Sequence, residues 1–196
     1  MRLRFNAPVT FSLALMAAAV MLVDRYLAAG LISSIFTAPG SNFDSTNPTH
    51  YIGLLTYVFG HESWTHLWNN FLIIILLGPI LEEKHDPKAF GIMILVATLI
   101  TGIFNILLKQ PPLVGSSAIA FMMIMLVSFA RSKPGDIPVS FILVFILYLL
   151  SELTKATAGT GSSSSIAHIV GGVCGVIFGF MKTSQTSAPP TGGNVA

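Results

Sequence analysis

Three short polar clusters interrupt long apolar runs, and their residue types could support acyl-transfer chemistry. They are residues 61–70 (HESWTHLWNN), 115–118 (GSSA) and 167–172 (AHIVGG). A serine and a histidine brought together would allow nucleophilic attack by Ser117, with the His168 imidazole as general base. His66 and Asn70 are spaced i, i+4, so they share one helix face and could both point at the oxyanion that acyl transfer creates.

No Asp or Glu lies within an apolar run close to His168, so a Ser–His dyad is the largest catalytic unit that the sequence supports. Each residue also has a structural interpretation. A serine in an apolar helix usually bonds its own backbone or a neighbouring helix, and His66, Asn70 and His168 could simply hold helices together. The catalytic interpretation therefore depends on whether the fold brings the three clusters to one depth.

A zinc site is a weaker interpretation of the same histidines. His61 and His66 stand in the pattern H-E-x-x-x-H, one residue longer than the zinc-protease motif. On a helix, this spacing turns the two imidazoles about 140° apart, so they could not bind one ion from the same face. The single cysteine, Cys174, excludes a cysteine-based zinc site or an internal disulfide. We expect neither a metal nor a cofactor.

The composition indicates a membrane protein. Charged residues make up 9% of the 196 residues and hydrophobic residues 53%, with a mean hydropathy of +0.78. A typical soluble domain has roughly 25% charged residues, and a soluble fold of this size could not hide so much apolar surface. The ten Lys and Arg residues are scattered along the chain, which excludes a basic surface for nucleic acid.

Gaps between charges predict an all-α bundle of six membrane-spanning helices, because a span needs about 20 apolar residues. The expected helices are about 8–29, 66–82, 88–108, 115–131, 137–154 and 165–182. The long first connection, from about residue 30 to 65, is interrupted by residues that usually break helices: Gly30, Pro39, Gly40, Asn42, Asn47 and Pro48. We interpret it as a loop that lies partly in the membrane interface. The domain would cover residues 1–182, followed by a disordered Ser-, Pro- and Gly-rich tail at 183–196.

The distribution of Lys and Arg predicts that both termini are cytoplasmic. With the N-terminus inside, most basic residues fall on the cytoplasmic side: Arg2, Arg4, Lys84, Lys88, Arg131, Lys133 and Lys182. The outer side then has only Arg25, Lys109 and Lys155. In this topology the second, fourth and sixth helices all enter from outside, so the three polar clusters lie near the outer face. Gly171, Gly175 and Gly179 would let the fourth and sixth helices approach closely.

These residues resemble the rhomboid family of intramembrane serine proteases, and the six-helix count is similar to the family's minimal bacterial core. The family pattern has H-x-x-x-N in the second helix, G-x-S-G in the fourth and A-H-x-x-G in the sixth. Here these motifs read His66…Asn70, Gly115-Ser116-Ser117-Ala118 and Ala167-His168-Ile169-Val170-Gly171. The resemblance covers most of the chain, from the loop before His61 to Phe180.

The resemblance implies a role for each matching residue. Ser117 would be the nucleophile and His168 its general base, while His66, Asn70 and the Ser117 backbone amide would stabilise the oxyanion. His61 would help to hold the outer ends of the helices. Glu82 resembles the family's acidic residue at the inner end of the second helix.

Two positions depart from the family pattern. Ala118 replaces the glycine that usually follows the nucleophile, which adds a methyl group where the fourth and sixth helices meet. Phe121 stands where many members have tyrosine; its ring can still stack on the His168 imidazole, but it brings no hydroxyl.

The expected function is a serine endopeptidase that cuts transmembrane protein substrates near the outer face of the lipid bilayer, in a bacterial inner membrane. The alternative is an inactive rhomboid-like protein that binds transmembrane clients without cutting them. A small transporter or channel would require further ionisable groups along a pathway, and the spans have almost none.

Overall fold

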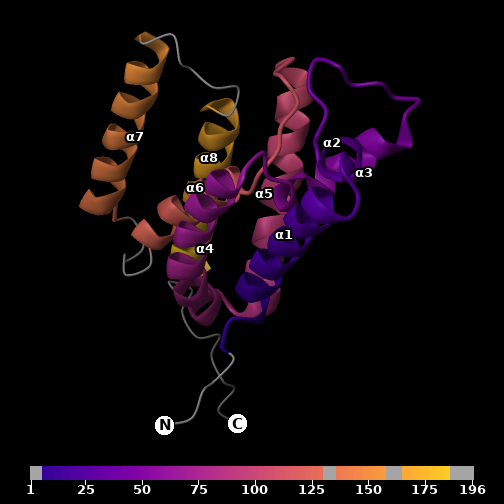
Figure 1. The fold of residues 1–196 in the computed structure, drawn as a ribbon. Helices are drawn as coiled ribbons and strands as arrows, with labels where there is room; N and C mark the ends of the chain where they lie inside the picture. Colours follow the sequence, from indigo (N-terminus) through magenta and orange to yellow (C-terminus); the bar gives the residue numbers. More distant parts are fainter. Residues whose placement is uncertain (1–5, 130–135, 158–164, 186–196) are drawn as a thin grey trace, which may run out of the picture.

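The computed structural model describes residues 6–129, 136–157 and 165–185, and within them the regular structure is helical (Figure 1). One isolated backbone bridge, between Ala38 and Leu113, is the exception in these ranges. The elements are α1 (Pro8–Tyr26), α2 (Leu31–Ile35), α3 (Pro48–Thr56), η1 (Tyr57–Phe59), α4 (Trp64–His85), α5 (Pro87–Leu107), α6 (Ser117–Ser128), α7 (Val139–Thr157) and α8 (Ser165–Gln185). The all-α fold class expected from the sequence is confirmed.

Among the described residues, α1, α4 and α5 are long and apolar enough to cross a membrane. Shorter apolar stretches lie in the other three long helices, at Ser117–Ser128, Val139–Tyr148 and Ser165–Met181. The protein is therefore an integral membrane protein. Helix α8 continues to Gln185, three residues into the predicted tail, and residues 186–196 lie outside the described ranges.

The sequence predicts a loop for the first connection, but the structure has three short helices within it, α2, α3 and η1. The asparagine and proline that we interpreted as helix breakers at residues 47 and 48 instead start α3. The Asn47 side chain accepts a hydrogen bond from the Thr49 amide at 3.0 Å, and Pro48 occupies the first helical position. Contacts of α2 with α1, and of α3 with α5, place this connection against the bundle.

Helix α6 begins two residues later than predicted, at Ser117, because Gly115 has a φ of +111° that a right-handed helix cannot contain. The predicted end at residue 131 falls outside the described residues; the helix ends at Ser128. Twelve residues make a helix about 18 Å long, against about 30 Å for the hydrocarbon core. Helix α6 as described is therefore shorter than the hydrocarbon core is thick.

A buried carboxylate joins the first two long helices. Glu82 on α4 is 1% exposed. Its side chain accepts hydrogen bonds from the Val9 and Thr10 amides at 2.8 and 2.9 Å and from the Thr10 hydroxyl at 2.8 Å. These amides belong to the first turn of α1, whose N-cap residue Ala7 has no side-chain bond to offer. Glu82 therefore caps α1 from another helix. Its carboxylate lies at the N-terminus of α1, which is the positive end of the helix dipole.

Replacing Glu82 by alanine should lower the free energy of unfolding by about 3 kcal/mol, because three donors, two of them buried, lose their acceptor. The measurement is unfolding of the purified protein in detergent, followed by circular dichroism. Glu83→Ala is the matched control, since Glu83 is the next residue and is exposed. Equal stability of the two variants would contradict the capping role.

Candidate active site

The turn that precedes Ser117 is held by the first connection. The Gly115 amide donates to the Tyr57 carbonyl at 3.0 Å, and Ala38 and Leu113 exchange two backbone bonds of 2.8 and 2.9 Å. These bonds fix residues 113–115 and so fix the position at which α6 starts. The first amide used inside α6 is that of Ala120, which donates to the Ser116 carbonyl at 2.9 Å. The Ser117 amide therefore takes no part in the backbone hydrogen bonds of α6. It lies at the N-terminus of the helix, where the helix dipole favours a negative charge.

Helix α4 places His66 and Asn70 against this turn. Its N-cap, Ser63, accepts a bond from the His66 amide at 3.1 Å, which sets the first turn of the helix. A β-carbon at Gly115 would lie 2.7 Å from His66 Cε1, 2.9 Å from His66 Nε2 and 3.6 Å from Asn70 Nδ2. Gly115 is thus required for space as well as for its positive φ. His66 and Asn70 therefore both lie next to Gly115, which agrees with the predicted shared helix face.

His61 lies behind these donors, 1% exposed. Its Nε2 is 3.0 Å from Asn70 Nδ2 and 3.3 Å from the Ser116 hydroxyl. These contacts place the His61 ring between Asn70 of α4 and Ser116 of the turn. Burial, and then the nearby charge of His66, lowers the pKa of His61 to about 4, so the ring is neutral at pH 7. His61 thereby connects the α4 face to the turn before α6.

Helices α6 and α8 meet closely next to Ser117. A β-carbon at Gly171 would lie 2.1 Å from the Ala118 carbonyl oxygen, so a side chain there would displace backbone. Ser117 is the first residue of α6 and His168 is in the first turn of α8. Both ring nitrogens of His168 are buried.

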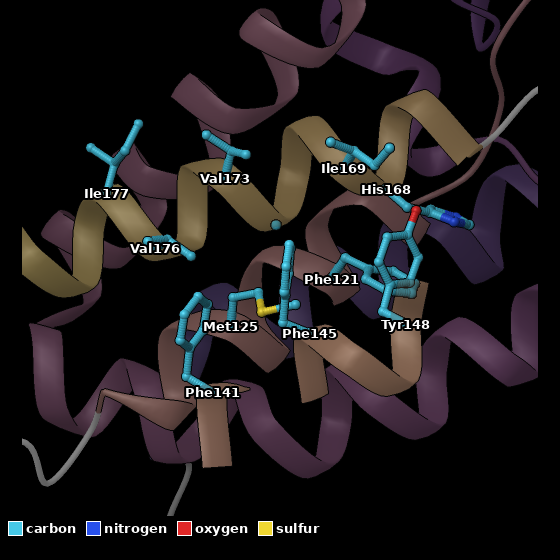
Figure 2. A pocket seen from close by; sticks show the side chains of 11 residues that line it. Phe121, Met125, Phe141, Phe145, Tyr148, His168, Ile169, Val173, Val176 and Ile177 are labelled. Atoms are coloured by element: carbon cyan, nitrogen blue, oxygen red, sulfur yellow. The ribbon is translucent and has the colours of Figure 1, made fainter. Parts of the chain in front are cut away.

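The His168 ring lies in a small aromatic cluster. Phe121 stacks on it with ring centroids 4.5 Å apart and planes at 15°, which fits the stacking expected from the sequence. Tyr148 of α7 meets Phe121 edge-on, with centroids 4.7 Å apart. Figure 2 shows the three side chains together at one end of a cavity between α6, α7 and α8.

The sequence analysis assigns no role to three groups that the structure brings to the site: the Ser116 hydroxyl, the Tyr57 carbonyl and the Tyr148 ring. Only Tyr148 could have been identified from the sequence. Tyr148 is a tyrosine within an apolar helix, and a buried tyrosine usually finds a hydrogen-bond partner for its hydroxyl. The other two depend on contacts between segments far apart in the chain.

Comparison with known proteins gives one family. The family model of the Rhomboid domain matches residues 48–185, which is more than two thirds of the chain. No curated protein matches the chain. The match includes all three polar clusters that the helices bring together, and the chain therefore belongs to the rhomboid family.

Proposed function

We propose that this protein is an intramembrane serine endopeptidase that cleaves transmembrane protein substrates near the outer membrane face. Its family generally consists of intramembrane serine proteases. The observation that supports catalysis most directly is the close contact of Gly171 with the Ala118 backbone, which sets the first turns of α6 and α8 side by side. That contact brings the nucleophile and the general base to neighbouring positions on two helices.

The chemistry follows from these positions. The Ser117 hydroxyl attacks the scissile carbonyl while His168 accepts its proton, and a tetrahedral intermediate forms. His66, Asn70 and the Ser117 amide donate to the oxyanion. Collapse of the intermediate breaks the C–N bond, and His168 gives its proton to the leaving amine. Water then hydrolyses the acyl-enzyme at Ser117 by the same sequence of proton transfers.

The proposal includes a topology. All six long helices, α1 and α4 to α8, would cross the bilayer, with both termini cytoplasmic and α4, α6 and α8 entering from outside. A bacterial inner membrane is the expected location. A start of α6 below the outer surface would place Ser117 where a substrate helix can unwind and expose a carbonyl.

The alternative is a client-binding protein without activity. One observation favours it: Ala118, which stands where the family pattern has glycine, is 1% exposed at the contact with Gly171 of α8. The two functions differ in whether Ser117 is an activated nucleophile.

A fluorophosphonate probe separates the two functions, because it reacts only with an activated serine. Purified wild-type protein in detergent should be labelled, and peptide mass spectrometry should place the label on Ser117. Absence of labelling in folded wild-type protein would favour client binding, and Ala118→Gly would then test whether the added methyl group is the cause.

Replacing Asn70 by alanine should slow this labelling by 10²- to 10³-fold, the usual effect of removing one oxyanion donor. The measurement is the second-order rate of labelling. Asn69→Ala serves as control, because Asn69 is the neighbouring amide and is exposed. If Asn70→Ala is labelled as fast as Asn69→Ala, Asn70 is no oxyanion donor.

A further inference from the structure

Among the described side chains of α7, one is buried at the site end of the bundle. Among the α7 side chains that the structure describes, Tyr148 is the buried one, 8% exposed, whereas Leu147 and Leu150 are 65% and 53% exposed. The helix packs chiefly against α6 and stands apart from the other helices in Figure 1. At its other end, Phe141 contacts Phe129 with ring centroids 5.3 Å apart. Near the site, the placement of α7 therefore depends on Tyr148.

Tyr148 contacts both α8, the helix that contains His168, and Phe121, the ring that stacks on His168. Its hydroxyl donates to the Ser165 carbonyl at 3.0 Å. Its ring meets Phe121 edge-on at 63°, and the His168 ring lies 6.4 Å from it at 72°. Ser165 is the first residue of α8, one turn before His168. One side chain of α7 thus holds the first turn of α8 and the ring stacked on the imidazole.

The aromatic rings around His168 border a cavity between three helices. A cavity of about 300 Å³ lies directly beside these rings, lined by apolar side chains of α6, α7 and α8, among them Met125, Phe145 and Val173 (Figure 2). The stack of Phe121 on His168 therefore lies at the border of this cavity. Phe121 has no hydroxyl with which to fix itself.

We propose that Tyr148 is a positioning residue for His168, which sets the orientation of the imidazole from α7 through its bond to Ser165 and its contact with Phe121. This inference rests on the proposed function, in which His168 is the general base. Tyr148 itself does not touch the reacting atoms.

The test compares Tyr148→Phe, which keeps the ring, with Tyr148→Leu, which removes it. For fluorophosphonate labelling of the full-length protein in detergent, the maximal rate and the half-saturating probe concentration are measured separately. Tyr148→Phe should lower the maximal rate about fivefold, the effect of one ordinary hydrogen bond. Tyr148→Leu should lower it by about 10- to 100-fold through misplacement of the base. The half-saturating concentration should stay unchanged, because probe binding does not use Tyr148.

Phe145→Leu is the matched control, since Phe145 lies on the same helix and lines the same cavity but stacks on Phe141. It should leave the maximal rate unchanged. A wild-type rate in Tyr148→Phe and Tyr148→Leu, or an equal loss in Phe145→Leu and Tyr148→Leu, would overturn the positioning role. If Tyr148→Leu does not fold, Tyr148→Phe decides the question. Unlabelled wild-type protein would instead overturn the proposed function.

Discussion

Replacing Ser117 by alanine is expected to abolish fluorophosphonate labelling and proteolysis, because the attacking oxygen is lost. Replacing His168 by alanine should slow both by roughly 10⁴- to 10⁶-fold, the range found when the base of a serine hydrolase is removed. The measurement is the labelling rate of each purified variant in detergent, with circular dichroism to confirm that it is folded.

Ser128→Ala is the control for these variants. Ser128 is at the other end of α6, where its hydroxyl bonds the Ile124 carbonyl at 3.1 Å. This variant should be labelled at the wild-type rate. Undiminished labelling of Ser117→Ala would show that another serine reacts, and undiminished labelling of His168→Ala would exclude His168 as the general base.

Replacing Gly171 by alanine should lower both stability and labelling, although the change adds only one methyl group. Its β-carbon would lie 2.1 Å from the Ala118 carbonyl oxygen and 2.8 Å from the carbonyl carbon, so α8 must move away from α6. We expect a loss of about 1–3 kcal/mol in the free energy of unfolding. Because Ser117 and His168 are on the two helices that separate, labelling should fall by about 100-fold.

The neighbouring glycine provides the control. A β-carbon at Gly172 would meet only the Met125 side chain, at 3.5 Å, which is an ordinary contact. Gly172→Ala should therefore be labelled normally, and its stability should be unchanged or slightly higher, since alanine favours a helix more than glycine does. Equal behaviour of the two alanine variants would contradict the proposed role of the close contact.

The sequence was most informative about the long apolar helices. The helices predicted at about 8–29, 66–82 and 88–108 correspond to α1, α4 and α5, because a membrane span needs uninterrupted apolar length. The first connection was harder to predict. Gly30, Asn47 and Pro48 were interpreted as signs of a loop, although Asn47 and Pro48 are also the residues that begin a helix.

At the site, the motifs identified the residues but not the contacts between them. The spacing of His66 and Asn70 predicts a shared face because i, i+4 neighbours are fixed by helix geometry. The bond of Ser116 to His61 joins residues 55 positions apart, and the tyrosine of α7 reaches α8 across a separate connection. Such contacts depend on how helices pack, which no local pattern in one sequence specifies.

The carboxylate that caps α1 also has a consequence for biosynthesis. Glu82 and Thr10 are 72 residues apart, so α1 is synthesised and inserted well before its cap exists. Until then, the amides of its first turn need water or lipid headgroups, because an unsatisfied amide in the hydrocarbon core costs several kcal/mol. The N-terminal turn of α1 must therefore stay at the interface while the rest of the chain is made. The final docking of α1 is a late step that waits for the second long helix.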